Sequence, residues 1–326
     1  MLLLNYDDVR RLLPMASCIE VVRQSLVALA SGQVHQPLRT VVRPPQSAGL
    51  MALMPAHMSG PEPIFGFKAV SVFPDNPLLG KDAHQGVVLL VDPHTGEPSA
   101  VVNASTITMI RTAAASAVAT DLLALPEAEE LAVIGSGVQA RAHILAMQCV
   151  RPIRRVRVVS RSAEHAHRLV AELTGQVKAE LVVAASIEEA LSGAEIVVTA
   201  TNAAAPLVSR QWLAGGGHVN AIGSSIPTTR ELDSATMAAG LLYTDRRESL
   251  LNESGDYLLA AAEGAIGPDN VRGELGELLI GTAPGRTSPS DITIFKSLGL
   301  AIEDLAAASY AVGQALESGA GTQFSW

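Results

Sequence analysis

The sequence lacks several features that would place it quickly in a functional class. Acidic residues outnumber basic ones, giving a net charge of −9 and a pI near 5.4, so no basic face for nucleic acid is expected. No run of about 18 apolar residues occurs, and no basic N-terminal segment leads into a signal peptide. No internal repeat and no metal-binding cluster of His, Cys, Asp or Glu is visible. We therefore expect a cytoplasmic protein with neither a membrane nor a nucleic-acid partner.

Cysteine is scarce, and basic residues gather in one place. The two cysteines, Cys18 and Cys149, match no metal or redox spacing. Both lie in helix-like apolar patterns, so we expect buried free thiols, which fits a reducing compartment. The arginines at 151, 154, 155 and 157 are expected to form a solvated edge at the start of a strand.

The first third of the chain predicts a helix followed by an antiparallel sheet. With 326 residues and 48% hydrophobic content, the chain has room for two domains. Helical periodicity covers residues 17–32 and 105–124. Between these helices, short β-rich runs are separated by Pro, Gly and Asp, which is typical of strands joined by turns. The runs are 40–43, 49–54, 66–73, 86–91 and 99–102.

From residue 131 the pattern alternates between strand and helix, which predicts βαβ units and a parallel sheet with right-handed crossovers. Expected strands are 131–135, 156–160, 181–184 and 195–200, with further apolar runs at 218–223 and 240–244. Expected helices are 138–150, 163–174 and 187–192. A last helix, 298–317, is expected to return to the first domain. The fold class is therefore α/β, with a doubly wound, Rossmann-type domain inserted in a mixed α/β domain.

A glycine-rich turn follows the first strand of that alternation. Gly135, Ser136, Gly137, Val138, Gln139 and Ala140 form a Gly-x-Gly-x-x-Ala string at the start of a helix. Gly135 makes the tight turn, Gly137 lets the backbone approach a pyrophosphate, and Ala140 lets the helix pack closely. The string alone is weak evidence, but its strand and helix context predicts dinucleotide binding.

The end of the second strand indicates which dinucleotide is preferred. NAD-binding proteins of this type place Asp or Glu there for the adenine ribose, whereas this chain has Ser160, Arg161 and Ser162. A basic, hydroxyl-rich segment suits a 2′-phosphate. We therefore expect NADP(H) to be preferred and NAD(H) to be a possible substitute; the alternative is that Arg161 only begins a solvated turn.

Two cations lie inside apolar stretches. Lys68 and Arg111 are surrounded by apolar residues, and few acidic residues are nearby in sequence. Buried cations need a partner, and a substrate carboxylate bound by the Arg fork would supply one. Internal salt bridges are the equally weighted alternative. Arg39 and Arg43 lie in the first β run.

The ordered motifs of the chain resemble the ornithine cyclodeaminase/mu-crystallin family. The likeness includes Phe67-Lys68, Gln85-Gly86, residues 107–114 around Arg111, the loop at 135–140, and Asn220-Ala-Ile-Gly223. Arg230-Glu231-Leu232 and Phe295-Lys-Ser-Leu-Gly299 continue it to the last helix. The likeness covers nearly the whole chain and keeps the order of the motifs.

The resemblance implies a substrate-binding and dimerisation domain of residues 1–116 plus 297–326, and an NADP(H)-binding Rossmann domain of residues 117–296. It implies a homodimer, and a small imino or amino acid as substrate. Arg43, Met54, Lys68 and Arg111 are assigned to the substrate, with Lys68 orienting its nitrogen or assisting proton transfer. The expected cofactor contacts are Thr112, Gly135, Ser136, Gly137, Val138, Gln139, Ala140, Ser160, Arg161, Ser162, Thr201, Gly223 and Gly299.

Two departures from the cyclodeaminase pattern point to a different reaction. Cyclodeaminases resembling this chain carry Glu and Asp where it has Ala52 and Ser225. Neither replacement titrates usefully, so base catalysis on a distal amine is lost. Carboxylate capture and hydride transfer remain, as in the family's ketimine reductases. Ser225 either hydrogen-bonds the imine nitrogen or a proton-delivering water, or only holds its loop. Alternative functions are an open-chain amino-acid dehydrogenase or imine reductase, a cyclodeaminase, and a non-catalytic NADPH-binding protein.

The remaining candidates have structural interpretations. His84 and His218 are expected to be satisfied structural histidines rather than acids. Asp291 either caps a turn or orients Lys296. The loop carboxylates Glu62, Asp75 and Asp82 are expected to be solvated.

Overall fold

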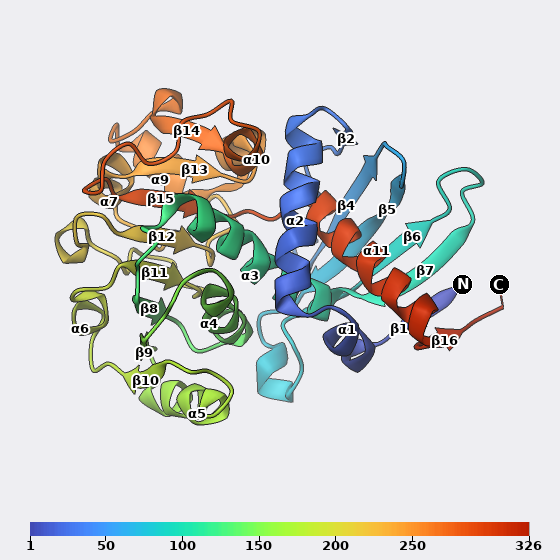
Figure 1. Ribbon diagram of the computed structural model, residues 1–326, viewed down its shortest axis with the longest axis horizontal. Coiled ribbons are helices and arrows are strands. Elements are labelled where there is room, and N and C mark those ends of the chain that lie inside the picture. The colour runs from blue at the N-terminus through green and yellow to red at the C-terminus, as the bar shows by residue number, and fades with distance from the viewer. Residues whose placement is uncertain (326) are drawn as a thin grey trace. The chain divides into compact units, whose positions relative to one another are not determined.

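The computed structural model describes residues 1–325, apart from the side chain of Pro77. The chain divides into two compact units, Met1–Arg111 with Gly299–Trp326, and Thr112–Leu298 (Figure 1). The sequence analysis placed these divisions at residues 116/117 and 296/297. The first division lies inside helix α3 (Ala104–Leu123), whose continuous apolar pattern gives no sign of where one unit ends.

The first unit is a mixed sheet with helices. Its strands run in the order β16-β1-β7-β6-β5-β4-β2, with β3 also paired to β4. β1 and β7 are parallel, and the other pairs are antiparallel. The strands are β1 (Leu2–Leu4), β2 (Val34–His35), β3 (Thr40–Val42), β4 (Leu50–Met58), β5 (Ile64–Val72), β6 (His84–Val91), β7 (Pro98–Asn103) and β16 (Thr322–Gln323). The helices are α1 (Tyr6–Leu12), α2 (Met15–Ala30), α11 (Ala301–Ser318), the short η1 (Asn76–Leu79) and the beginning of α3.

Alternation along β4 and β5 gives this sheet one buried and one exposed face. On β4, Ala52 and Met54 are buried whereas Met51 and Leu53 are exposed. Helix α11 packs on β4, β5 and β6, and α2 packs on α11; the two helices come from opposite ends of the sequence and lie side by side, blue and red in Figure 1. Lys68 lies on the helix-covered face, since it pairs in register with Met54.

The second unit is an eight-stranded sheet in the order β10-β9-β8-β11-β12-β15-β13-β14, with every pair parallel. Its strands are β8 (Glu130–Ile134), β9 (Arg155–Val159), β10 (Glu180–Val183), β11 (Ile196–Thr199), β12 (His218–Ala221), β13 (Leu241–Thr244), β14 (Val271–Glu274) and β15 (Thr293–Lys296). The helices are α4 (Val138–Val150), α5 (Ala163–Leu173), α6 (Ile187–Leu191), α7 (Ser234–Ala239), α8 (Arg247–Glu253), α9 (Gly255–Ala262), α10 (Leu275–Leu279), η2 (Arg210–Trp212) and η3 (Pro268–Asn270). The α/β, Rossmann-type fold class predicted from the sequence is confirmed.

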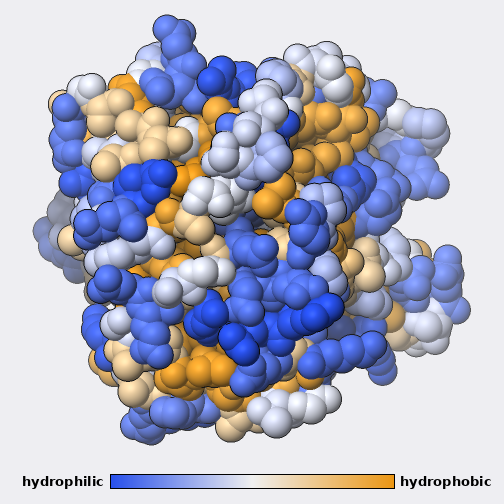
Figure 2. Space-filling view, turned by 60° about the vertical axis from the view of Figure 1, so that its left-hand side comes forward, coloured by the Kyte–Doolittle hydropathy of each residue, from blue (hydrophilic) through white to orange (hydrophobic). Residues whose placement is uncertain are grey.

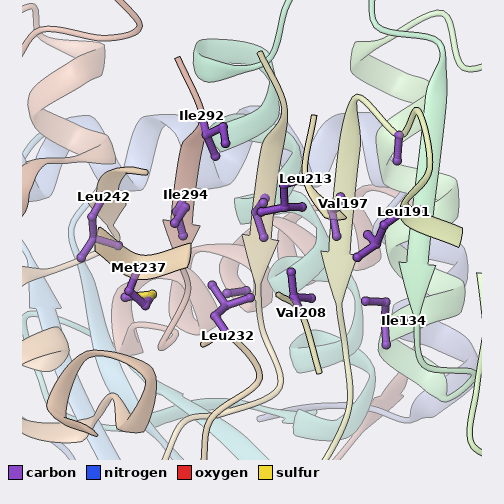
Figure 3. Close-up of a cluster of buried hydrophobic side chains, with 14 of the residues drawn as sticks. Ile134, Leu191, Val197, Val208, Leu213, Leu232, Met237, Leu242, Ile292 and Ile294 are labelled. Atoms are coloured by element: carbon purple, nitrogen blue, oxygen red, sulfur yellow. The ribbon is translucent and has the colours of Figure 1, made fainter. Parts of the chain in front are cut away.

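Branched and small apolar side chains fill the core of the second unit. Figure 3 shows part of one cluster, to which Val197 on β11, Leu242 on β13 and Ile294 on β15 contribute. Strands buried on both faces by helices carry near-continuous apolar runs, as expected for a parallel sheet. This core fixes the strand ends, from which the loops of the site emerge.

Two expectations about individual residues were wrong. Cys149 is exposed, because it falls on the outer side of α4 near its end; Cys18 is buried as expected. Arg151 is buried rather than solvated. Its guanidinium donates to the carbonyl oxygens of Thr120, Asp121, Ala124 and Leu125, at 2.9 Å each, and so satisfies the open carboxyl end of α3.

One face of the surface is shown by hydropathy in Figure 2. The face drawn in Figure 2 carries apolar residues in separate patches among hydrophilic ones. Within residues 1–325 no single helix has the length and apolarity to cross a membrane, although the bent pair Tyr6–Leu12 and Met15–Ala30 passes that test jointly by length and composition.

Candidate active site

The two glycines of the loop in the second unit, Gly135 and Gly137, are required for different physical reasons. Gly135 leaves β8 with φ +125°, and a Cβ on it would lie 2.4 Å from the carbonyl oxygen of Ala200, so only glycine makes this turn. Gly137 is the N-cap of the 13-residue helix α4 and has no side-chain cap. A Cβ on Gly137 would meet nothing within 4 Å. The first amides of α4 are therefore left open to an anion such as a pyrophosphate.

The end of β9 is joined to this loop by serine hydroxyls. The Oγ atoms of Ser136 and Ser160 are 2.8 Å apart, and Ser162 caps α5 by accepting from the amide of His165. Arg161 is exposed and makes no hydrogen bond or ion pair within the described chain. Its guanidinium is thus available to a phosphate next to the glycine loop.

A buried carboxylate, Glu231, fixes the carboxyl ends of β11 and β12. It accepts from Thr199 Oγ1 at 2.7 Å, from the amide and hydroxyl of Thr201 at 2.8 and 2.6 Å, and from the amide of Gly223 at 2.7 Å. Burial raises the pKa of Glu231, against the charge of Lys296 and the hydrogen bonds of the threonines. Two expected cofactor contacts, Thr201 and Gly223, are therefore held by one side chain. The Arg230-Glu231-Leu232 string was noticed only as a family motif.

The carboxyl edge also carries a buried ion pair. Lys296 Nζ, at the end of β15, lies 2.9 Å from Asp256 Oδ2, and both side chains are fully buried. Asp291 instead accepts from the amides of Thr287 and Ser288. The turn-capping interpretation of Asp291 is therefore correct, and the hypothesis that it orients Lys296 is wrong.

The expected structural histidines differ from one another. His218 is buried, with Nδ1 2.9 Å from Thr293 Oγ1, and burial lowers its pKa to about 3, so it is a neutral structural residue as predicted. His84 begins β6, is exposed and makes no side-chain hydrogen bond within residues 1–325, so the interpretation as a satisfied histidine was wrong there. Desolvation and the charge of Lys68 lower the pKa of His84.

Ser225 lies in the loop after β12 and is exposed. Its neighbour Ser224 is buried, and the hydroxyl of Ser224 bonds to the backbone carbonyl and hydroxyl of Thr229. The loop is thus held by Ser224, whereas Ser225 is exposed. A role for Ser225 at the imine nitrogen stays a prediction.

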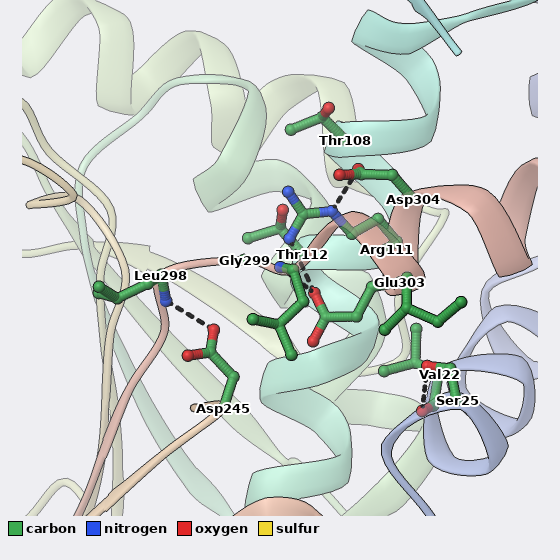
Figure 4. Close-up of polar contacts among 12 residues, drawn as sticks. Val22, Ser25, Thr108, Arg111, Thr112, Asp245, Leu298, Gly299, Glu303 and Asp304 are labelled. Carbon is green, nitrogen blue, oxygen red and sulfur yellow. Dashed lines mark hydrogen bonds and ion pairs between the residues drawn. The ribbon is translucent and has the colours of Figure 1, made fainter. Parts of the chain in front are cut away.

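In the first unit, Lys68 and Arg111 are brought together by helix α11. Lys68 Nζ lies 2.5 Å from Asp304 Oδ2, and Arg111 Nε lies 2.7 Å from Asp304 Oδ1. Arg111 Nη1 lies 3.1 Å from Glu303 Oε2. Figure 4 draws both carboxylates of α11 beside the guanidinium. The premise that acidic partners are lacking was therefore wrong, because the partners come from the far end of the sequence. The internal salt bridges that the sequence analysis gave as the alternative are present.

Burial and charge act in opposite directions on this cluster, which we call the cation cluster (Lys68, Arg111, Glu303 and Asp304). Burial lowers the pKa of Lys68 to about 8, against the attraction of Asp304. For Asp304, burial favours the neutral form, but the charges of Arg111 and Lys68 bring its pKa below the ordinary value. The cluster holds two cations and two anions, so it carries no excess charge when all four are ionised.

The other residues expected near the substrate differ in burial and in their contacts with these cations. Met54 is buried and pairs in register with Lys68, and Ala52 lies two residues earlier on the same face of β4. Gly299, an expected cofactor contact, has φ +77° and would place a Cβ 2.6 Å from Arg111 Nη1, while its carbonyl accepts from Arg39 at 3.1 Å. Arg43 follows β3 and is exposed.

Other expected positions lie as follows. Thr112 is buried at the start of the second unit, and its carbonyl accepts from Ser116. The side chain of Ser116 also bonds to His143 of α4, and His143 bonds to the carbonyl of Gln139. Burial lowers the pKa of His143 to about 4, so this link between α3 and the glycine loop is uncharged. In the described residues no group of three or more His, Cys, Asp or Glu side chains could hold a metal ion.

One unit has a parallel sheet with a glycine loop at an uncapped helix, and the other has a buried cation cluster. Together these features define a two-unit dinucleotide-binding protein of the Rossmann type. The sequence profile of the ornithine cyclodeaminase/mu-crystallin family matches residues 1–319, and the chain belongs to this family.

Three relatives show which proteins the chain resembles. The chain is 39% identical to the ketimine reductase mu-crystallin of Mus musculus over 277 residues, covering 85% of this chain and 84% of that protein. The structure of Thermococcus litoralis Delta(1)-pyrroline-2-carboxylate reductase in complex with NADH and L-proline is 36% identical, has a TM-score of 0.97, and the match covers 99% of this chain and 100% of that one. An archaeal alanine dehydrogenase dimer with bound NAD is 30% identical, with a TM-score of 0.94 and coverage of 100% and 99%.

Proposed function

We propose that this protein reduces a cyclic ketimine carboxylate, Δ1-pyrroline-2-carboxylate or Δ1-piperideine-2-carboxylate, to L-proline or L-pipecolate with a nicotinamide cofactor. The carrying observation is the cation cluster, in which Asp304 joins Lys68 of β5 to Arg111 of α3. On β4, Ala52 lies two residues before Met54 on the same buried face and is not a carboxylate. This arrangement suits capture of a carboxylate. It offers no base at that position for a distal amine. The reductases among the relatives support the same activity.

Different residues bind the substrate carboxylate, the imine nitrogen and the cofactor. Arg111, with Lys68 and Arg43, binds the substrate carboxylate and fixes the ring. Lys68 hydrogen-bonds the imine nitrogen or supplies its proton, for which a pKa of about 8 is well placed near neutral pH. When bound, a reduced nicotinamide supplies the hydride that the iminium carbon accepts, giving the secondary amine and the oxidised cofactor. The open amides at Gly137 and the strand-end residues Thr201 and Gly223 fit such a cofactor.

Within this activity we propose a preference for NADPH. The Thermococcus relative holds NADH, but here the end of β9 carries Arg161, exposed and unpaired within residues 1–325, next to the bonded hydroxyls of Ser136 and Ser160. A guanidinium pairs well with a 2′-phosphate, and a carboxylate that would repel one is missing from this segment.

Arg161→Ala is expected to weaken the binding of NADPH more than the binding of NADH. Loss of one charge-assisted contact costs about 1.5–3 kcal/mol, so KM for NADPH should rise roughly 10- to 150-fold while KM for NADH stays within about twofold. Arg168→Ala is a matched control, since Arg168 is an exposed arginine of the following helix, paired with Glu164. Equal losses for the two cofactors would refute the 2′-phosphate role of Arg161.

We also propose a homodimer formed by the exposed face of the first unit's sheet. The apolar side chains on this face share one side of the sheet in register and are at least 36% exposed. They are Val42, Met51, Leu53, Phe65, Phe67 and Val87. Such a contiguous apolar area is typical of a subunit interface. The archaeal alanine dehydrogenase relative, described as a dimer, supports the same assembly.

Met51→Glu combined with Phe65→Glu should therefore break the dimer. Light scattering after gel filtration is expected to give twice the 33.9 kDa chain mass for the wild type and one chain mass for the double variant. Leu316→Glu is the control, because Leu316 is 64% exposed on α11, away from this face, and should leave the dimer intact. A monomeric wild type, or a dimeric double variant, would contradict the interface.

We also propose that the protein is cytoplasmic, as the sequence led us to expect. Cys18 and Cys149 are both free, as proteins of a reducing compartment usually keep their thiols. The exposed Cys149 would be vulnerable to oxidation elsewhere.

A substrate panel tests the activity. Consumption of NADPH is expected with Δ1-pyrroline-2-carboxylate and Δ1-piperideine-2-carboxylate, because a protonated cyclic imine is already a strong electrophile. Little or none is expected with pyruvate or glyoxylate plus ammonia or methylamine, which would reveal an open-chain dehydrogenase. Release of ammonia from ornithine without added cofactor would indicate a cyclodeaminase. NADPH binding without turnover of any substrate would indicate a binding protein.

A further inference from the structure

Asp304 joins the two substrate-binding cations directly. It lies in the first turn of α11 and is fully buried, with Oδ2 2.5 Å from Lys68 Nζ and Oδ1 2.7 Å from Arg111 Nε. Each oxygen of one carboxylate thus contacts one cation, and the cations come from two other elements, β5 and α3. A bridging carboxylate of this kind fixes the separation of the two positive groups more tightly than packing alone, because charge-assisted hydrogen bonds are short and directional.

We propose that Asp304 is the positioning residue of the cation cluster: it aligns Lys68 with Arg111 for the substrate carboxylate and keeps Lys68 protonated for its part at the imine nitrogen. This inference rests on the proposed function. Asp304 acts through Lys68 and Arg111, and contact with the substrate is left to those two residues.

The groups around Lys68 favour this assignment. Arg111 of α3 and Arg39, before β3, are positive and disfavour the charged form of Lys68, as does its burial. His84 of β6 lies within the influence of the charges of Lys68, Asp82 and Arg111. The thiol of Cys18, on α2, feels the charges of Arg111, Glu303 and Asp304. Asp304 raises the pKa of Lys68 through its charge and its hydrogen bond, although burial still brings that pKa down to about 8. Lys68 Nζ also donates to the uncharged hydroxyl of Thr108, at the longer distance of 3.5 Å. Without Asp304, Lys68 would lose its proton at a lower pH.

Glu303 provides a matched control from the same turn of the same helix. It is equally buried, and its ion pair is with Arg111 at 3.1 Å, while its Oε2 also accepts from the amide of Leu300. Replacing Glu303 by Gln removes one buried negative charge from the cation cluster, as Asp304→Asn does. If only the amount of charge mattered, the two substitutions would have the same effect on Lys68.

The protonation of Lys68 can be followed without any activity. The chain has four lysines, so protein labelled with ¹³C at lysine Cε gives a countable set of NMR signals, with Lys68 assigned by the loss of its signal in Lys68→Arg. We expect the Lys68 titration midpoint to fall by about one to three pH units in Asp304→Asn and to stay within about half a unit in Glu303→Gln. The alkaline limb of kcat/KM for the cyclic imine should move with that midpoint in Asp304→Asn and stay in place in Glu303→Gln.

A second substitution keeps the inference testable if Asp304→Asn does not fold. Asp304→Glu retains the charge but shifts the carboxylate, so the midpoint should stay near the wild-type value while KM for the imine rises. An unchanged midpoint in Asp304→Asn, equal shifts in Asp304→Asn and Glu303→Gln, or a fall in Asp304→Glu as large as in Asp304→Asn would each overturn the assignment. If the wild type reduces no cyclic imine, the proposed function fails, whereas the NMR titration still decides the relation between Asp304 and Lys68.

Discussion

Replacing Arg111 by Ala should lower kcat/KM for the cyclic imine by roughly 30- to 1,000-fold, corresponding to about 2–4 kcal/mol of lost transition-state stabilisation. The guanidinium is the forked donor of the cation cluster, and no other side chain of the cluster can bind a carboxylate with two parallel hydrogen bonds. Because the imine must be held through the hydride transfer, we expect kcat to fall as well as KM to rise.

The same substitution also leaves Glu303 and Asp304 buried with one cation fewer, which would destabilise the fold on the order of 3–5 kcal/mol. Arg111→Lys separates the two effects, because it keeps the charge but loses the fork. It should retain most of the thermal stability and still lose at least about tenfold in kcat/KM. Arg154→Ala, at an exposed arginine of the second unit paired with Glu129, should change neither. A folded Arg111→Ala protein with wild-type kcat/KM would show that the carboxylate assignment is wrong.

Gly137→Val should abolish most cofactor binding while leaving the fold intact. Gly137 has the extended backbone of an N-cap, with φ −86° and ψ −169°, which valine adopts readily. Its Cβ would meet no protein atom within 4 Å, so the added side chain fills the space that a pyrophosphate needs above the α4 amides. Loss of even one amide-to-phosphate bond costs about 1.5–3 kcal/mol, so Kd for NADPH, measured by calorimetry, should rise roughly 10- to 150-fold.

Gly135→Ala is the contrasting variant. At φ +125° and with a Cβ 2.4 Å from the Ala200 carbonyl oxygen, alanine strains the turn itself, so the midpoint of thermal unfolding should fall even without cofactor. Equal thermal midpoints for the two variants would contradict this separation. Unweakened NADPH binding by Gly137→Val would place the pyrophosphate elsewhere.

The fold could be predicted largely from local patterns. The bounds of α4, Val138–Val150, agree with the predicted 138–150, because Gly137 precedes the helical period and Pro152 keeps Arg151 out of the helical backbone. Strands β1, β2 and β16 are two or three residues long, too short for any alternation to show. Cys149 and Arg151 were placed wrongly, because at a helix end one residue decides between the buried and the solvent side.

The candidate site was predictable in its cations but not in their partners. Apolar surroundings singled out Lys68 and Arg111, but Glu303 and Asp304 lie more than 190 positions from Arg111 in sequence. No periodicity or spacing relates residues so far apart, and helix α11 was recognised only as an apolar helix. Glu231 was missed in its role for the same reason, since its bonds to Thr201 and Gly223 exist only once β11 and β12 are adjacent.

Transfer of deuterium from labelled cofactor tests the central claim most directly. The protein is incubated with NADPH carrying deuterium at nicotinamide C4, in both stereochemical forms, and Δ1-pyrroline-2-carboxylate, and the product is analysed by chiral mass spectrometry. We expect L-proline with one deuterium at the α-carbon from one of the two labelled forms, and unlabelled L-proline from the other. If neither form labels proline while NADPH still binds, the protein is not a ketimine reductase and the account of its cation cluster as a site for cyclic imines is contradicted.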